Sequence, residues 1–325
     1  MTFGRSADQS AYVPLEVSDF ALSSGAGTMT ELSPRPYILV GIDGSRSSFE
    51  ALLWAIGEAQ LRNLPLRLVH AVDYGNFVMG FNPGASESFF KQVETAGQNF
   101  LNEAKERVQA LAPEVEVSVH ILTGRPAQLL EEQSKDAYLT VVGSSGLHGF
   151  TGLLAGSVAV SLTAHGHSPV VVVRAPGAHA GGPVVVGISG APDSEEAIGW
   201  AFQEASLRGA KLLAVLVSSY VPAYFDYIEP TWEELPGPAR EDQQAMLLSE
   251  RLAGWQEKFP EVAVRRVIAA GHPGHVLLGY AQRAQLIVTG TRGHGNVAGW
   301  FLGSTSHRLV QHAACPVLVA RPQAR

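Results

Sequence analysis

Two copies of one glycine pattern hold the residues of this sequence that could do chemistry. Both copies follow G-x2-G-x9-G-S, at residues 143–157 (GSSGLHGFTGLLAGS) and 290–304 (GTRGHGNVAGWFLGS). Each copy follows a short β-branched run, and its final Gly-Ser pair opens a helical pattern. Glycines leave main-chain N–H groups open to a ligand because no Cβ blocks the approach. A helix N-terminus adds unpaired amides and the positive end of its dipole, so the pattern predicts a phosphate cradle.

This pattern differs from the commonest phosphate-binding motifs. The sequence contains no G-x4-G-K-[ST] loop and no G-x-G-x-x-G dinucleotide fingerprint. Glycines at the end of one strand also occur as ordinary turns, which is the alternative interpretation of either copy alone. Two copies with identical spacing favour a binding role.

The composition indicates a globular protein with a large core. A chain of 325 residues is long enough for two α/β domains, and 46% of its residues are hydrophobic while 16% are charged. The formal net charge of −7 argues against binding along a nucleic-acid backbone. Any bound phosphate should therefore be held locally by amides.

The remaining composition indicates a cytoplasmic protein. The single cysteine, Cys315, excludes an intrachain disulfide framework and suits a reducing compartment. No apolar run has the length that crossing a bilayer requires, and we expect no membrane partner. The N-terminus has no basic region followed by an apolar core, so no signal peptide is expected.

Strands alternate with helical patterns, and the whole series occurs twice. In the first half, Ser47 and Glu50 form a capping-box pattern, and apolar residues at spacings of three or four between Phe89 and Leu111 predict a long amphipathic helix. The matching positions of the two halves are offset by 146 residues early and 147 late. We predict a flexible tail at 1–35 and two domains, at 36–175 and 183–322.

Alternation of this kind predicts a parallel sheet with helices on both faces. Ligands of such sheets bind outside the carboxyl ends of the strands, where the strand order reverses. Asp43 ends the first predicted strand and Gly143 ends the fourth. If these strands are neighbours, one carboxylate and one phosphate cradle face the same crevice, which suits a nucleotide.

The sequence resembles the universal stress protein family in its tandem, ATP-binding form. The resemblance extends from Tyr37 to Arg321 and depends on VGIDGS at 40–45, LVHAV at 68–72 and both glycine motifs. It implies two Rossmann-like α/β domains (adenine nucleotide alpha hydrolase-like), each with a five-stranded parallel sheet of order 3-2-1-4-5. It also implies that the last strands of the two domains, 169–174 and 316–321, pair as an intrachain pseudo-dimer.

The same resemblance implies a role for each residue of the two cradles. Gly41, Ala71 and the Asp43 side chain would line the adenine and ribose, the loop glycines would approach the ribose and α-phosphate, and the helix start would bind the outer phosphates. The first-half positions are Gly41, Asp43, Ala71, Gly143, Gly146, Gly149, Gly156, Ser157 and Val158. The second-half positions are Gly187, Ser189, Val217, Gly290, Arg292, Gly293, Gly303, Ser304 and Thr305.

The two halves differ at two of these positions. The first half has the acidic residue Asp43 where the second has Ser189, and the second has Arg292 where the first has Ser145. Loss of a charged hydrogen bond typically costs about 1.5–3 kcal/mol, which weakens a site tenfold or more. We therefore expect the first half to be the better adenosine site and the second to depend more on phosphate.

The function expected from the resemblance is regulation by bound ATP, with Mg, in stress survival or growth control. No catalytic residue and no resident metal site are evident, so at most slow ATP hydrolysis is expected. His272 and His275 lack a third ligand, and Gly187-Ile188-Ser189-Gly190-Ala191 misses the last glycine of a hydrolase elbow.

Two other functions stay open. The aromatic linkers, at 73–86 and 218–240, would let the chain act as a nucleotide-independent scaffold for an unidentified protein partner. A true enzyme of the same superfold, transferring adenylyl groups or cleaving pyrophosphate, would need a signature that the sequence lacks. A further homodimer is also left open.

Overall fold

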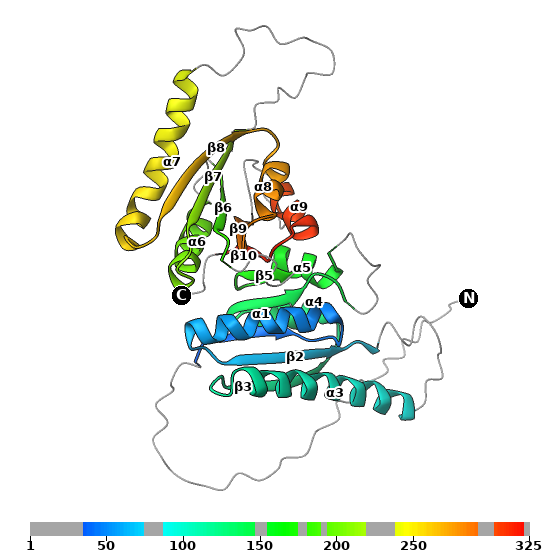
Figure 1. Cartoon of the computed structure of the whole chain (residues 1–325). Coiled ribbons are helices and arrows are strands. Elements are labelled where there is room, and N and C mark those ends of the chain that lie inside the picture. The colour runs from blue at the N-terminus through cyan, green and yellow to red at the C-terminus, as the bar shows by residue number, and fades with distance from the viewer. Residues whose placement is uncertain are drawn as a thin grey trace, which may run out of the picture. The chain divides into compact units, whose positions relative to one another are not determined.

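The computed structural model describes residues 35–74, 87–146, 155–174, 181–189, 194–218, 238–291 and 302–321 (Figure 1). Pro36–Arg325 forms a compact unit separate from Met1–Arg35. The predicted tail lies outside the described residues apart from Arg35, as does most of both aromatic linkers. No described helix combines the length and apolar character needed to cross a membrane.

Strands and helices alternate along both halves, as the sequence pattern predicts. The first half contains β1 (Tyr37–Gly41), α1 (Arg46–Arg62), β2 (Leu66–Val72), α3 (Glu87–Leu111), β3 (Val117–Thr123), α4 (Pro126–Gln133), β4 (Ala137–Gly143), α5 (Ser157–His165) and β5 (Val170–Val173). The second half contains β6 (Val184–Ile188), α6 (Glu195–Leu207), β7 (Leu212–Ser218), α7 (Pro238–Lys258), β8 (Val264–Ala270), α8 (Pro273–Ala281), β9 (Leu286–Gly290), α9 (Ser304–His312) and β10 (Val317–Ala320).

The described strands form one continuous sheet in the order β3-β2-β1-β4-β5-β10-β9-β6-β7-β8. Strands within each half are parallel, and each half has the order 3-2-1-4-5 when its own strands are numbered. The predicted α/β class and strand order are confirmed. In each half the order reverses between the first and fourth strands, which are hydrogen-bonded neighbours.

The two halves join through their last strands, as the resemblance implied. β5 and β10 are antiparallel, with Leu318 opposite Val171 and Val317 opposite Val172. Every residue of both strands is buried. Pairing at this junction covers two apolar strands that would otherwise be open sheet edges.

Helices cover both faces of the sheet (Figure 1). One buried cluster joins the strands to α1, α3, α6 and α7, and the other joins them to α4, α5, α8 and α9. Side chains alternate between these clusters along β5, where Val171 and Val173 belong to the first and Val170 and Val172 to the second.

Two local predictions are wrong. The N-cap of α1 is Ser45, whose hydroxyl accepts a bond from the Ser48 N–H, and not Ser47 of the supposed capping box. Glu50 instead pairs with Arg46 on the exposed face. Leu111, counted in the apolar stripe of α3, is 57% exposed, because the buried face continues from Val108 to Ala112, the residue after the helix ends.

Candidate functional site

The sequence-predicted residues of the first half meet at the carboxyl ends of β1, β2 and β4. Gly41 ends β1, Ala71 lies near the end of β2 and Gly143 ends β4. All three residues are partly exposed. Because β1 pairs with both β2 and β4, these strand ends lie side by side at the point where the strand order reverses.

Asp43 faces the second glycine of the first motif. A Cβ built on Gly146 would lie 2.7 Å from Asp43 Oδ2, so the glycine makes room for the carboxylate. The other oxygen, Oδ1, accepts a bond of 3.0 Å from the Ser45 N–H. This bond ties the carboxylate to the beginning of α1, and it holds one oxygen of Asp43 against the loop that follows β4.

The loop after β4 is also bound to the beginning of α1. The Ser145 N–H donates to Ser47 Oγ at 3.4 Å, and Ser45 Oγ donates to the Ser145 carbonyl at 3.4 Å. A Cβ on Gly143 would fall 2.6 Å from the Ser47 carbonyl carbon. Close packing of α1 against the end of β4 therefore requires a glycine at position 143, whether or not Gly143 also contacts a ligand.

Gly156, the last glycine of the motif, lies close to the turn that contains the first two glycines. The Gly156 N–H donates to the Ser144 carbonyl at 2.7 Å, and a Cβ on Gly156 would lie 3.7 Å from the Gly146 nitrogen. Gly156 is the N-cap of α5, where no side chain caps the helix, and Ser157 and Val158 form its first turn. The strand end, the glycine turn and an uncapped helix N-terminus are thus brought together as predicted.

In the second half, as in the first, a hydrogen bond joins the residue after the fourth strand to the N-cap of the following helix. The Gly303 N–H donates to the Thr291 carbonyl at 2.8 Å, and Gly303 is the N-cap of α9, again without a side-chain cap. Ser304 and Thr305 begin that helix. Gly290 ends β9 and its carbonyl accepts a bond of 2.6 Å from Ser306 Oγ.

The second half differs where Ser189 replaces the carboxylate. Ser189 Oγ lies 2.7 Å from Ser194 Oγ, and the Ser189 N–H donates to the same hydroxyl at 2.9 Å. Ser189 is therefore bonded to the beginning of α6. A Cβ on Gly187 would lie 2.7 Å from Leu277 Cδ1, so close packing against α8 explains the glycine at this position. Val217 is partly buried and packs against the core cluster that contains Leu277.

Three sequence-predicted site residues lie outside the described residues: Gly149, Arg292 and Gly293. Sequence reasoning missed Ser45 and Ser47, which hold the loop of the first half. Their signal is the polar run DGSRSS after the first strand, in which the sequence predicts a binding role for Asp43 and a helix cap at Ser47 but no contact with the later loop.

The residues present fit a nucleotide better than a resident metal ion. The start of α5 has main-chain amides without a side-chain cap, and Asp43 provides a carboxylate beside Gly146. Within the described residues no group of three or more His, Cys, Asp and Glu side chains could hold a metal ion. His275 contacts the Arg308 guanidinium, and its ring lies 5.3 Å from that of His272. Burial raises the pKa of the Cys315 thiol to about 12, which makes it a poor nucleophile.

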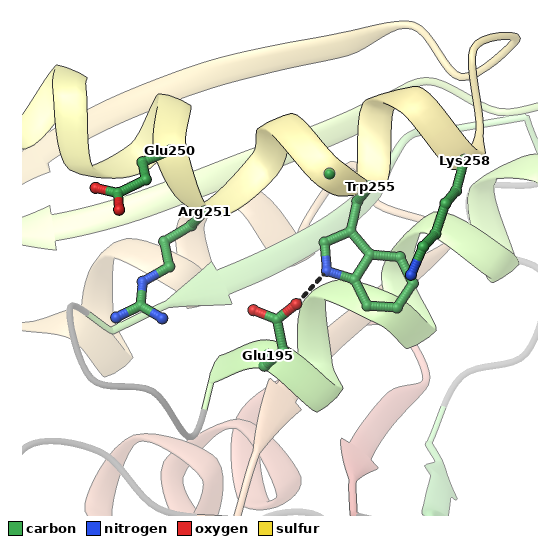
Figure 2. Close-up of a pocket in the computed structure, with 6 residues that line it drawn as sticks. Glu195, Glu250, Arg251, Trp255 and Lys258 are labelled. Carbon is green, nitrogen blue, oxygen red and sulfur yellow. Dashed lines mark hydrogen bonds between the residues drawn. The ribbon is translucent and has the colours of Figure 1, made fainter.

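A groove between α6 and α7 is lined by Glu195, Glu250, Arg251, Gly254, Trp255 and Lys258 (Figure 2). Trp255 donates a hydrogen bond of 2.6 Å to Glu195, and the Lys258 ammonium lies 4.6 Å from the indole centroid. The indole also stacks on Phe202 and Phe259. These contacts pack α7 against α6, and this helix packing explains the residues that line the groove.

Comparison with known proteins shows a single family across the described unit. The model of the universal stress protein family matches residues 36–174 and 182–321. A universal stress protein of Mycolicibacterium smegmatis is 38% identical over 296 residues, covering 88% of this chain and 97% of the relative. One of Mycobacterium tuberculosis is 35% identical over 291 residues, covering 87% of this chain and 96% of the relative.

Solved structures show the same fold. A universal stress protein from Archaeoglobus fulgidus superposes with a TM-score of 0.65 at 19% identity, covering 88% of this chain and 98% of that chain. A putative universal stress protein from Pseudomonas aeruginosa superposes with a TM-score of 0.58 at 18% identity, covering 89% and 94%. At these identities the likeness concerns the fold alone.

Proposed function

The chain belongs to the universal stress protein family, with two such domains in tandem, and we propose that it binds ATP and acts as a nucleotide-dependent regulator. The observation that carries the proposal is the closed loop of the first half. There Gly156 approaches Gly146 at the uncapped start of α5, and Asp43 faces the same glycine. We further propose that the protein works in the cytoplasm, in stress survival or growth control.

The residues of the first half would divide the work between sugar and phosphates. Asp43 would accept hydrogen bonds from the nucleoside, while Gly41 and Ala71 would present main-chain atoms to it. Gly143 and Gly146 would let the ribose and α-phosphate approach the loop. The Gly156 N–H is bonded to the Ser144 carbonyl, so Gly156 would give the outer phosphates room to approach, and the amides of Ser157 and Val158 would bind them at the helix N-terminus. Mg would arrive with the phosphates and neutralise part of their charge.

We propose that the second half binds more weakly. Ser189 carries no charge, and its hydroxyl is already bonded to Ser194. Phosphate contacts at Gly290, Gly293, Gly303, Ser304 and Thr305, with the Arg292 guanidinium, would supply most of its affinity. Regulation would then follow occupancy, because a ligand that binds one state better stabilises that state by mass action.

The experiment combines nucleotide content with titration. The purified protein is denatured, released nucleotides are separated and counted, and nucleotide-free protein is titrated with Mg-ATP. Gly146→Ala should weaken the first site by roughly tenfold or more, since the added methyl displaces a carboxylate that makes a charged hydrogen bond. Gly57→Ala is the matched control, because a Cβ there meets nothing within 4 Å.

The outcomes separate the proposal from its alternatives. Binding that Gly146→Ala weakens and Gly57→Ala leaves unchanged supports the first cradle. No released nucleotide and no heat on titration would overturn ATP binding and favour the nucleotide-independent scaffold. Magnesium-dependent turnover well above slow background hydrolysis would instead favour an enzyme.

A further inference from the structure

A pair of identical charged motifs meets between the two halves. The sequence EAxLR occurs at 58–62 in α1 and again at 204–208 in α6, at equivalent positions of the repeat. Its charged residues form one cluster of two carboxylates and two guanidiniums, here called the EAxLR cluster: Glu58, Arg62, Glu204 and Arg208. Arg62 binds Glu58 and Glu204, each at 2.5 Å, and Arg208 binds Glu58 at 2.5 Å.

The EAxLR cluster is removed from solvent. The side chains of Glu58 and Glu204 are 0% exposed, and those of Arg62 and Arg208 are 8% and 14% exposed. Aromatic rings enclose it: the Arg62 guanidinium lies over Trp200, and that of Arg208 lies over Trp54. Charges buried in this way are weakly screened, so a change in the charge of one member has a large effect on the others.

The two carboxylates are not equally satisfied. Glu58 accepts a hydrogen bond on each oxygen, from Arg62 and from Arg208. Glu204 accepts one, on Oε1 from Arg62. Its Oε2 is buried and lies 2.9 Å from Arg208 Nη2, but no donor among the described residues is aligned to bond it. A buried carboxylate oxygen without an aligned donor is poorly stabilised when charged.

No other charged group among the described residues faces Glu204. From α1 it faces Glu58 and Arg62, and from its own helix Arg208. The Tyr138 hydroxyl of β4 accepts a hydrogen bond of 2.9 Å from Arg62 at the edge of the cluster. The strands beneath α6 contribute aliphatic side chains to the same core, including Val184, Val186, Leu286 and Val288.

We propose that the EAxLR cluster is a proton-sensitive joint between the two halves, in which Glu204 takes up a proton as the pH falls through neutrality and the joined halves become more stable. The joint does not depend on nucleotide binding. Its location explains why the same motif is kept in both halves: each helix supplies one acid and one base, and only the joined chain places the second carboxylate beside the first.

The direction of the pH effect follows from the balance of charges at Glu204. Burial first, and the Glu58 carboxylate second, raise the pKa of Glu204 to about 7, against the opposing effect of Arg208 and Arg62. A carboxyl with a raised pKa in the folded state binds more protons there than in the unfolded state. Its stabilising contribution is therefore complete below its ordinary pKa and is lost as the pH rises through about 7.

The first test follows unfolding of the full chain by denaturant between about pH 5 and pH 8. The folding constant of the wild type should fall by roughly a hundredfold across this range because of Glu204. Glu204→Gln, which resembles the protonated acid, should lose this fall. Glu103→Gln, at an exposed pair with Arg107, is the control and should keep the wild-type profile.

The second test begins with the wild type and can contradict the proposal without any variant. Infrared spectra of the full-length wild type should show a protonated carboxyl band at mildly acidic pH that disappears as the pH passes neutrality. A band that is present in the wild type, retained in Glu103→Gln and lost in Glu204→Gln supports the joint. Absence of a titrating band in the wild type overturns the proposal, and so do superimposable stability profiles for the wild type and Glu204→Gln.

Discussion

The clearest difference between the two candidate sites lies at a single residue. Asp43 directs one oxygen to the Ser45 N–H and the other toward Gly146, whereas Ser189 is bonded to Ser194. Among the described residues, therefore, only the first half has a carboxylate beside its glycine loop. This difference gives each half a distinct expected affinity for nucleoside, although their loops close in the same way.

Replacing this carboxylate by an amide tests its part in binding. Asp43→Asn keeps an oxygen for the Ser45 N–H but removes the charge, so affinity for Mg-ATP at the first site should fall by roughly tenfold or more. Adenosine, which lacks phosphates, should be affected at least as strongly. Calorimetric titration of both ligands measures the two effects.

The matched control removes a carboxylate elsewhere. Glu103→Gln lies on the exposed face of α3, paired with Arg107, and should bind both ligands as the wild type does. If Asp43→Asn also binds like the wild type, the carboxylate has no part in nucleoside recognition.

At the residue scale, prediction from the sequence succeeded where a residue type has one dominant structural role. Glycines at 143, 146 and 156 indicated close approach, and the structure brings them together around Ser144 and Ser145. The EAxLR cluster was missed because charges four residues apart on a helix usually pair with each other at the surface. Only the contact between α1 and α6 reveals that they are buried.

At the scale of elements, the position of α1 depends on a turn that only glycine can make. Gly44 has φ +81°, and a Cβ there would lie 2.6 Å from the ring of Phe100 on α3. The Phe100 ring also meets His70 edge-on at 5.8 Å. The turn between β1 and α1 is thus packed beneath α3, which covers the same face of the sheet.

Gly44→Ala should therefore destabilise the protein for two reasons. The left-handed conformation costs roughly 1–2 kcal/mol with a Cβ, and displacement of Phe100 adds about 1–3 kcal/mol. Gly209→Ala isolates the first cost, because Gly209 has φ +58° and a Cβ there meets nothing within 4 Å. Denaturant unfolding of both variants measures the difference, and equal losses would show that Phe100 yields freely.

Elements were predictable where the hydrophobic period was strong and less so at their ends. The period of α3 was clear, but Leu111 is exposed while Ala112 beside it is buried, since spacings of three and four do not decide which of two adjacent apolar residues faces the core. The cap of α1 was misplaced by two residues because Ser45, Ser47 and Ser48 all suit a helix start. Hydrogen bonding to Ser48 decides among them.

At the scale of the whole molecule, the junction between the halves is self-complementary. Leu318 stands opposite Val171, and these two residues occupy equivalent positions of the repeat, 147 residues apart. Val317 and Val319 likewise stand opposite Val172 and Val170. The junction therefore has the pairing of a two-fold dimer, in which a strand meets its own equivalent, and the EAxLR cluster follows the same symmetry.

This symmetry predicts what happens when the halves are separated. A fragment of residues 36–174 would expose four buried valines of β5 together with Glu58 and Arg62. It should pair with a second copy of itself through β5, with Val171 opposite Val171, because an open apolar edge seeks another strand. Sedimentation velocity should show a dimer.

Two lysine variants of the fragment test the pairing. Val171→Lys places a charge at the centre of the β5 pairing and should yield a monomer. Ser118→Lys, on the opposite sheet edge in β3, should leave the dimer intact. A fragment that stays monomeric without the lysine would mean that the linked chain, and not the strand edge, holds the halves together.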